Sequence, residues 1–328
     1  MNKFKLYLVV ISLALVLFSC NKDSNTSEPT PIRDFAVQYE TDSTTIADYL
    51  KTHYIENLVN HPGFTDDQDI TLGKIPTGGT QSSIWSLLDS PTFPMLFKKT
   101  VELHDIVYTV YYLKLRDDNT VDGETPTKVD AVLASYNGFY LKDNSTTSDG
   151  VKKIDIESTS FESVIYPQQP LGLDATIRGW SEIFPKFVSG SYTESDESSP
   201  NPAVYKDFGA GVMFLPSGLG YYNGASGSIP SYSPLVFSFK LYKVKRADQD
   251  EDGILSVDED LNGDLDPTND DTDGDGKPNY QDIDDDGDGA LTKTEIKIDG
   301  VIPSSYDLIL DCSGLTTGTK KHLDKSCR

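Results

Sequence analysis

The feature that most constrains this chain is a segment near its C-terminus in which acidic side chains crowd together. Residues 248–299 contain 20 acidic and 3 basic side chains, so 17 of the 24 net negative charges of the 328-residue protein lie there. Closely spaced carboxylates repel one another unless cations neutralise them, so we expect the order of this segment to depend on cations. The rest of the chain is only mildly acidic and offers no basic face for a nucleic acid, so no nucleic-acid partner is expected.

The acidic residues recur at the spacing of calcium ligands. In residues 248–259, aspartates occupy positions 1, 3 and 5, Gly253 occupies position 6, and a glutamate closes the twelve-residue loop. Ca²⁺ requires such alternating oxygen ligands, a glycine for the sharp turn, and a bidentate closing acid. The pattern recurs twice more, and the predicted ligands are Asp248, Asp250, Asp252, Glu259, Asp271, Asp273, Asp275, Asp282, Asp284, Asp286, Asp288 and Glu295. A fourth match, Asp260-Asn262-Asp264, lacks the glycine and is weaker.

The three loops begin at residues 248, 271 and 284, which leaves too little chain between them for the flanking helices of EF-hands. The segment 247–299 therefore resembles thrombospondin type 3 calcium repeats, in which ions replace a hydrophobic core. This resemblance implies a calcium-stabilised, loop-rich appendage. Extracellular modules bind Ca²⁺ at about 10⁻⁴–10⁻³ M, which suits a structural role for the ion better than signalling.

The N-terminus has the features of an export signal. Lys3 and Lys5 precede an apolar run over residues 6–18 that is too short to span a membrane. The sequence Leu17-Phe18-Ser19-Cys20 that ends it resembles bacterial lipoprotein signals, in which the cysteine is acylated and becomes the new N-terminus. We expect a signal peptide at 1–19, lipidated Cys20 and a flexible tether at 20–34, and attachment of the protein to a membrane of the bacterial cell envelope. An ordinary secretory signal with a chance cysteine is the alternative, and the side of the membrane is left open.

If Cys20 carries lipid, Cys312 and Cys327 remain as a pair in the tail, residues 300–328. An exported protein occupies an oxidising space, so we expect a disulfide between them. Two free thiols are the alternative.

Between tether and acidic segment, the hydrophobic pattern predicts an α+β fold. A helix is expected at 46–58, capped by Thr44 or Thr45, because its apolar residues recur at helical spacing. Two segments without clear periodicity, 65–93 and 189–209, are interpreted as insertions. Strands are expected where β-branched and aromatic residues are frequent, at 107–112, 129–136, 212–215 and 235–244. One short helix is expected at 180–187, which completes the α+β pattern.

Six short motifs occur in one order over residues 128–246: Tyr136-Asn137-Gly138, Phe161-Glu162-Ser163, Leu171-Gly172, Ile177-Arg178-Gly179-Trp180, the segment 216–221 ending in Leu219-Gly220-Tyr221, and Ile229-Pro230 followed by Leu235-Val236-Phe237. Together they resemble FKBP-type peptidyl-prolyl isomerases. The resemblance implies a twisted antiparallel sheet wrapped around a short helix, with a proline-binding pocket between them. Residues 35–127 would form an N-terminal extension of that domain.

The resemblance also implies roles for individual residues. Trp180 would form the floor of the pocket, and the Ile177 backbone N–H and the Tyr221 hydroxyl would donate hydrogen bonds to substrate carbonyls. The walls would be Tyr136, Phe161 and Phe237, and the rim would include Ile177 and Ile229. Glu162 stands where the family usually has aspartate. Proline-containing polypeptides would be the clients.

The chemistry also follows from the residue types. Rotation about an X–Pro bond must break amide conjugation, which costs roughly 18–20 kcal/mol. The twisted amide has less charge separation than the planar one, so a water-free aromatic pocket favours it, and only such differential binding accelerates a reaction. No proton transfer and no cofactor is required. Four positions depart from the family pattern, namely Glu162, Thr176, Tyr222 and Ser231, so a proline-binding module with little turnover, or a calcium-stabilised surface interaction protein, remains an alternative.

Overall fold

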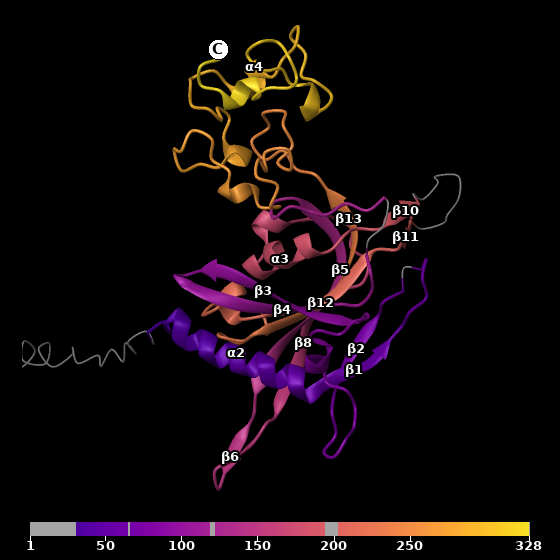
Figure 1. Cartoon of the computed structure of the whole chain (residues 1–328). Coiled ribbons are helices and arrows are strands. Elements are labelled where there is room, and N and C mark those ends of the chain that lie inside the picture. The colour runs from indigo at the N-terminus through magenta and orange to yellow at the C-terminus, as the bar shows by residue number, and fades with distance from the viewer. Residues whose placement is uncertain (1–30, 65, 119–121, 194–202, 328) are drawn as a thin grey trace, which may run out of the picture. The chain divides into compact units, whose positions relative to one another are not determined.

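Seven strands form the central antiparallel sheet of the chain (Figure 1). The computed structural model describes residues 31–64, 66–118, 122–193 and 203–327, so the predicted signal peptide and Cys20 lie outside the described residues. The described residues from Asp34 onward form one compact unit. The strand order is β3-β4-β12-β13-β5-β8, and β9 also pairs with β5. The strands are β3 (Met95–Leu103), β4 (Ile106–Lys114), β5 (Ala131–Asp143), β8 (Ile156–Val164), β9 (Leu171–Gly172), β12 (Gly209–Leu215) and β13 (Leu235–Lys245).

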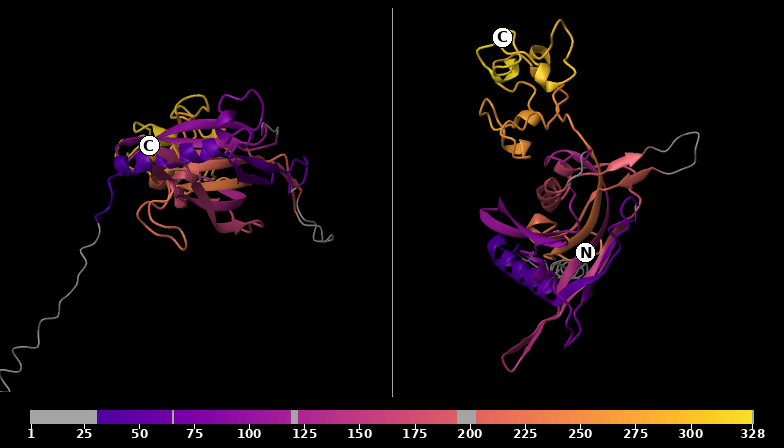
Figure 2. Two further views of the ribbon diagram at one scale, coloured as in Figure 1. Left: turned by 90° about the horizontal axis from the view of Figure 1, so that it is seen from below. Right: turned by 45° about the vertical axis from the view of Figure 1, so that its right-hand side comes forward.

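Helices cover both faces of this sheet, so apolar cores form on both sides. Phe237 and Phe239 of β13 pack with the short helix α3 (Arg178–Ile183) and with η3 (Phe184–Lys186) that continues it. Val236 and Tyr242 of the same strand belong to a second core with the long helix α2 (Phe35–Thr52). Figure 2 shows the helices and sheet from two further directions. The predicted α+β fold with a short helix against antiparallel strands is confirmed, whereas the second covered face was not predicted.

Helix α3 lies so close to β12 that a glycine is required at its contact point. A Cβ atom on Gly179 would come within 2.4 Å of Leu215 Cδ1. Contacts that short do not occur between carbon atoms, so any larger residue would push the helix away from the sheet. The glycine before Trp180 therefore sets how deeply the tryptophan is buried.

The predicted boundaries of the first helix are wrong at both ends. Helix α2 begins at Phe35, where the Asp34 side chain accepts hydrogen bonds from two backbone N–H groups, and it ends at Thr52. Thr44 lies inside the helix, and its hydroxyl donates to the Glu40 carbonyl (2.9 Å). The residues that follow form β1 (His53–Leu58), which pairs with β2 (Ile70–Lys74). Pairing with the next strand along the chain overrides the helical spacing of the apolar residues here.

Strand β4 contains the strand predicted at 107–112, and it is the second half of a hairpin with β3. His104 and Asp105 make the turn, with φ values of 56° and 59°, as a two-residue type I′ turn requires. Because β4 also pairs with β12, the sheet is not confined to residues 128–246. The segment 35–127 contributes two of its strands.

The two predicted insertions contain short regular elements. The first holds β2 and η1 (Ile84–Leu87), and the ends of the second pair as β10 (Ser191–Thr193) and β11 (Val204–Lys206). A hairpin of β6 (Thr146–Ser148) and β7 (Val151–Lys153) extends between β5 and β8. Among the described residues, no helix combines the length and apolar composition needed to cross a membrane.

The acidic segment and the tail consist of loops with short helical turns. These are η5 (Pro267–Asn269), η6 (Asn279–Gln281), α4 (Thr292–Glu295), η7 (Tyr306–Leu308) and η8 (Lys321–Leu323). Their buried apolar cluster is small and consists of Ile254, Ile296 and Ile309. Cys312 and Cys327 form a disulfide, with their Cα atoms 5.5 Å apart. A backbone hydrogen bond from Lys128 N–H to the Leu265 carbonyl (3.0 Å) connects this region to the sheet.

Candidate functional site

Four predicted aromatic residues meet on the α3 side of the sheet. The Trp180 ring lies 4.9 Å from Tyr136 and 5.3 Å from Phe237, measured between ring centroids, and both contacts are edge-to-face. Phe161 of β8 makes a third such contact with Phe237 at 5.6 Å. Edge-to-face packing places the positive edge of one ring on the negative face of another, which fixes ring orientation. The rings therefore form an ordered apolar cluster with Trp180 at its base.

The remaining predicted residues surround this cluster. Ile229 is buried, with 4% of its surface exposed, and both it and Ile177 pack on the same core. Tyr221 follows η4 (Ser217–Leu219) and is 38% exposed. Tyr222 points elsewhere: it is buried and stacks on Phe35 of α2 at 4.1 Å. This contact gives a structural reason for one of the departures from the family pattern.

Glu162 interacts with both tyrosines of the cluster. Burial, followed by a hydrogen bond to Glu162 and the charge of its carboxylate, raises the pKa of Tyr136 to about 12. Burial and the same charge raise the pKa of Tyr221. The extra methylene of glutamate thus still brings the carboxylate to Tyr136. Both phenols keep their protons at neutral pH, so the Tyr221 hydroxyl can act as a donor.

Gly138 explains how Phe161 reaches the cluster. A Cβ atom at this position would lie 2.5 Å from Phe161 Cζ and 3.0 Å from Phe237 Cε1. The ring of Phe161 therefore crosses β5 directly over the glycine. The glycine of the motif Tyr136-Asn137-Gly138 indicates that another side chain approaches the strand here, although the sequence alone does not reveal that it is the ring of Phe161.

Two buried acids support the cluster and were missed by the sequence analysis. Glu182 of α3 is 2% exposed and pairs with Lys99 (2.5 Å), Lys128 (2.9 Å) and Arg178 (2.6 Å). Asp42 of α2 is 1% exposed and accepts hydrogen bonds from the backbone N–H (2.7 Å) and hydroxyl (2.6 Å) of Ser217. Most of these partners are far away in the sequence, so no local pattern indicates them.

A cavity of about 730 Å³ adjoins this cluster, and Tyr136 lines it. Its lining includes Leu133, Ser135, Lys240 and Tyr242, which alternate along β5 and β13 with the residues that face Trp180. Of the four cluster residues, Tyr136 lines the cavity, whereas Phe161, Trp180 and Phe237 do not. The cavity therefore does not correspond to the predicted proline pocket.

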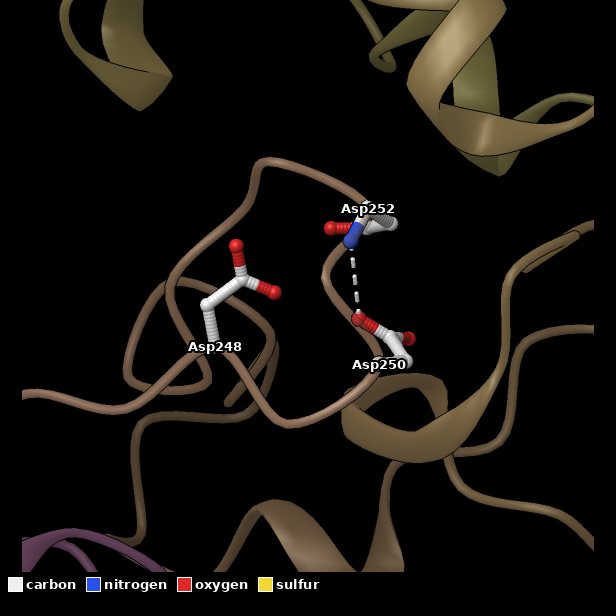
Figure 3. A group of neighbouring side chains, drawn as sticks. All are labelled: Asp248, Asp250 and Asp252. Carbon is white, nitrogen blue, oxygen red and sulfur yellow. Dashed lines mark hydrogen bonds between the residues drawn. The ribbon is translucent and has the colours of Figure 1, made fainter.

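The predicted calcium ligands at positions 1, 3 and 5 gather within each loop, whereas the closing acids Asp282 and Glu295 belong to no such group among the described residues. Carboxylate oxygens of Asp248, Asp250 and Asp252 lie within 4.8 Å of one another (Figure 3). The same holds for the aspartates at positions 1, 3 and 5 of the other two loops, namely Asp271, Asp273 and Asp275, and Asp284, Asp286 and Asp288. The glycine at position 6 has a positive φ in every loop, with values of 104°, 96° and 91° for Gly253, Gly276 and Gly289.

The three loops also share their hydrogen bonds. The N–H at position 5 donates to the side chain at position 3 over 3.2, 3.0 and 3.1 Å in chain order. The N–H at position 7 donates to the aspartate at position 5 over 2.7, 2.8 and 2.7 Å. In the weaker fourth match, Asp264 N–H donates to Asn262 (2.9 Å), and Leu265 adopts a φ of 70° in place of the missing glycine. Its backbone therefore follows the same course.

The donor set fits a divalent cation that prefers oxygen. Buried carboxylate oxygens without a hydrogen-bond donor occur on Asp248, Asp250, Asp252, Glu259, Asp284, Asp286 and Glu295. Burial, then the charges of Asp250 and Asp252, raises the pKa of Glu259 to about 10, and burial with the charges of Asp286 and Asp288 raises that of Glu295 to about 7. Oxygen atoms that are buried and unpaired are normally satisfied by a partner, and Ca²⁺ would supply one. Asp282 differs, because it lies 3.6 Å from the Lys277 ammonium group.

In comparisons with known proteins, part of the chain matches one family model, and the chain is similar to several solved structures. Residues 249–319 match the family model described as BamM C-terminal, in the region that the sequence analysis compared with thrombospondin type 3 repeats. A peptidyl-prolyl cis-trans isomerase from Pseudomonas syringae pv. tomato str. DC3000 is similar at 16% identity and a TM-score of 0.30, over 66% of this chain and 100% of that one. FkpA from Escherichia coli is similar at 26% identity and a TM-score of 0.24, over 42% of this chain and 48% of that one, so the chain spans about half of FkpA. No curated protein matches the chain.

Proposed function

We propose that the aromatic cluster binds prolyl residues and that the protein is a peptidyl-prolyl cis-trans isomerase. The observation that carries the proposal is the arrangement of Tyr136, Phe161 and Phe237 around a buried Trp180, with the protonated hydroxyl of Tyr221 at an exposed position beside them. A prolyl ring is apolar and flat enough to rest on an indole.

The catalytic step is rotation of one bond. The cluster excludes water, which disfavours the charge-separated planar amide relative to the twisted one. The Tyr221 hydroxyl and the Ile177 backbone N–H would hold the flanking carbonyls of the substrate and so fix one end of the rotating bond. No side chain needs to accept a proton, and no cofactor takes part.

We further propose that the protein works in the bacterial cell envelope on exported polypeptides. Its N-terminal sequence up to Cys20 supports a lipid anchor, and the Cys312–Cys327 disulfide suits an oxidising compartment. The acidic loops would hold Ca²⁺ through the carboxylates at positions 1, 3, 5 and 12. The ion would neutralise their mutual repulsion and keep the appendage ordered.

Tyr221→Phe tests the isomerase proposal, because it removes the hydroxyl and keeps the ring. The wild-type protein should accelerate isomerisation of a short X–Pro peptide, and the variant should lose about three- to tenfold in kcat/KM, the value of one net hydrogen bond. Tyr166→Phe, at an 83% exposed tyrosine, is the matched control and should behave as wild type.

The alternatives predict different results. A wild-type protein that binds the peptide without accelerating its isomerisation would be a proline-binding module instead. Absence of both binding and acceleration would sink the proposal for the aromatic cluster altogether and favour a role in surface interaction through the appendage.

A further inference from the structure

We propose that Asp285 is a ligand of the calcium ion held by the loop at residues 248–259, so that one ion joins two loops that are distant in the sequence. The inference rests on the proposed calcium binding of the acidic segment and adds a ligand that the loop pattern does not contain. Asp285 occupies position 2 of its own loop, a position that is not used for ligands.

The geometry places Asp285 at the first loop. Oxygen atoms of Asp252, Glu259 and Asp285 all lie within 4.8 Å of one another. Ca²⁺ binds oxygen at about 2.3–2.6 Å, so two ligands of one ion are at most about 5.2 Å apart. Asp252 also belongs to the group with Asp248 and Asp250. The two groups share this residue, so Asp285 lies next to the ligands of the first loop.

The burial of these acids indicates that something satisfies them. Asp252, Glu259 and Asp285 are 1%, 2% and 2% exposed. Within the described part of the chain, no donor reaches either oxygen of Glu259, either oxygen of Asp285, or Asp252 Oδ2 with hydrogen-bond geometry. The ammonium group of Lys293, on the same side of the segment, donates instead to the Glu251 carbonyl (2.6 Å). Three buried carboxylates without donors repel one another when ionised, and a cation between them would neutralise that repulsion.

The backbone of the third loop holds Asp285 in this position. Its N–H donates to the Thr292 hydroxyl (3.1 Å), and the Thr292 N–H donates to the Ile283 carbonyl (2.9 Å). Meanwhile Asp284 and Asp286, on either side, belong to the separate group of their own loop. Position 2 of the other two loops is Gln249 and Thr272, so only this loop offers a carboxylate there.

The apolar packing joins the same two loops. Ile254 directly follows Gly253 of the first loop, Ile296 directly follows Glu295 of the third, and both are in the cluster with Ile309. A calcium ion bound by Asp252, Glu259 and Asp285 would thus join the same two loops that the isoleucines already hold in contact. Loading of the first site therefore stabilises the third loop even before that loop binds its own ion.

Asp285→Asn in the full chain tests the inference, with Asp299→Asn as the control because Asp299 is exposed in the same segment. Calcium binding is followed by isothermal titration, and Tm is measured with excess Ca²⁺ and with chelator. We expect Asp285→Asn to weaken one class of sites about tenfold or more and to lower Tm in Ca²⁺. With chelator the variant should be at least as stable as wild type, because one of the repelling charges is gone. The control should match wild type in both conditions.

The two possible failures are distinguishable. If wild type shows no calcium binding and no change of Tm with chelator, the proposed calcium role is wrong. The second failure is that wild type binds Ca²⁺ but Asp285→Asn binds it with the same affinity and differs from wild type in Tm by the same amount with Ca²⁺ and with chelator. The calcium role would then stand, and the assignment of Asp285 as a ligand would be overturned.

Discussion

The buried side chain of Asp42 on α2 holds a loop that lies far away in the sequence. Its carboxylate accepts two hydrogen bonds from Ser217, the first residue of η4, and a third from the Gln38 amide (2.7 Å). The chain reaches Tyr221 two residues after η4 ends. The position of the proposed donor hydroxyl is therefore tied to a helix that lies outside the family pattern.

We expect Asp42→Ala to lower the free energy of unfolding by about 2–4 kcal/mol, because it leaves the Ser217 N–H and hydroxyl buried without an acceptor. Denaturant titration measures this. Asp48→Ala in the same helix is the control: it removes only the pair with Lys152 (2.8 Å), whose side chain is 42% exposed, and should cost no more than about 1 kcal/mol. Equal losses in the two variants would contradict the assigned role of Asp42.

His53 makes the stability of the α2 side sensitive to acid. Burial lowers its pKa to about 4, although its ring hydrogen bonds to the Tyr49 carbonyl (3.0 Å). In the unfolded chain the pKa is about 6.5, so between these values the folded state binds fewer protons than the unfolded state. The contribution is complete above about pH 6.5 and is lost as the pH falls toward 4.

We therefore expect the unfolding free energy to fall between pH 7 and pH 4.5, with about 1–3 kcal/mol of the loss due to His53. His53→Gln, which cannot be charged, should flatten this slope in denaturant titrations at a series of pH values. His61→Gln, at an exposed histidine, should not change it. An unchanged slope in His53→Gln would show that the buried imidazole does not control the acid response.

At the scale of the elements, ion pairs of Glu182 hold the helix α3 in place. Burial alone would raise the pKa of Glu182, but hydrogen bonds from Lys99 and Lys128 outweigh it and lower the pKa. The carboxylate is thus ionised and holds the helix to β3 through Lys99, which also donates to the Glu182 carbonyl (3.0 Å). Trp180, the proposed floor of the pocket, lies two positions away on the same helix.

We expect Glu182→Leu to cost about 3–5 kcal/mol of unfolding free energy, because the cations around it lose their buried partner. The fluorescence of Trp180 should also shift toward that of an exposed indole. Lys74→Ala, which removes an exposed pair with Asp155, should change neither quantity measurably. A Glu182→Leu protein with wild-type stability would mean that apolar packing alone holds α3.

Elements with a strong local signal were predicted well. The helix expected at 180–187 corresponds to α3 and η3, and the strand expected at 235–244 corresponds to β13. Errors arose where strand pairing decides the structure: residues 53–58 have helical spacing but pair with β2. The start of α2 was misplaced because Thr44 and Thr45 look like caps, whereas Asp34 is the residue that caps.

At the scale of the whole molecule, four aromatic residues of the ordered motifs, Tyr136, Phe161, Trp180 and Phe237, contact one another because each lies at a fixed place on a strand or helix. The motifs could not reveal that β3 and β4 belong to the same sheet, since that depends on pairing across β12. Nor could they reveal the link at Lys128, which pairs with both Glu182 of α3 and Asp266 of the acidic segment. Through this lysine the helix below the proposed pocket contacts the proposed calcium appendage.

The strand order has a consequence for how the chain is made. Strands β12 and β13 occupy the middle of the sheet, yet they are the last of its strands along the chain, and every residue of β12 is buried. Until Gly209 and the residues after it emerge during synthesis or export, β4 and β5 each retain an open edge that attracts other strands. A protein proposed to help others fold thus spends much of its own biogenesis as a chain at risk of aggregation.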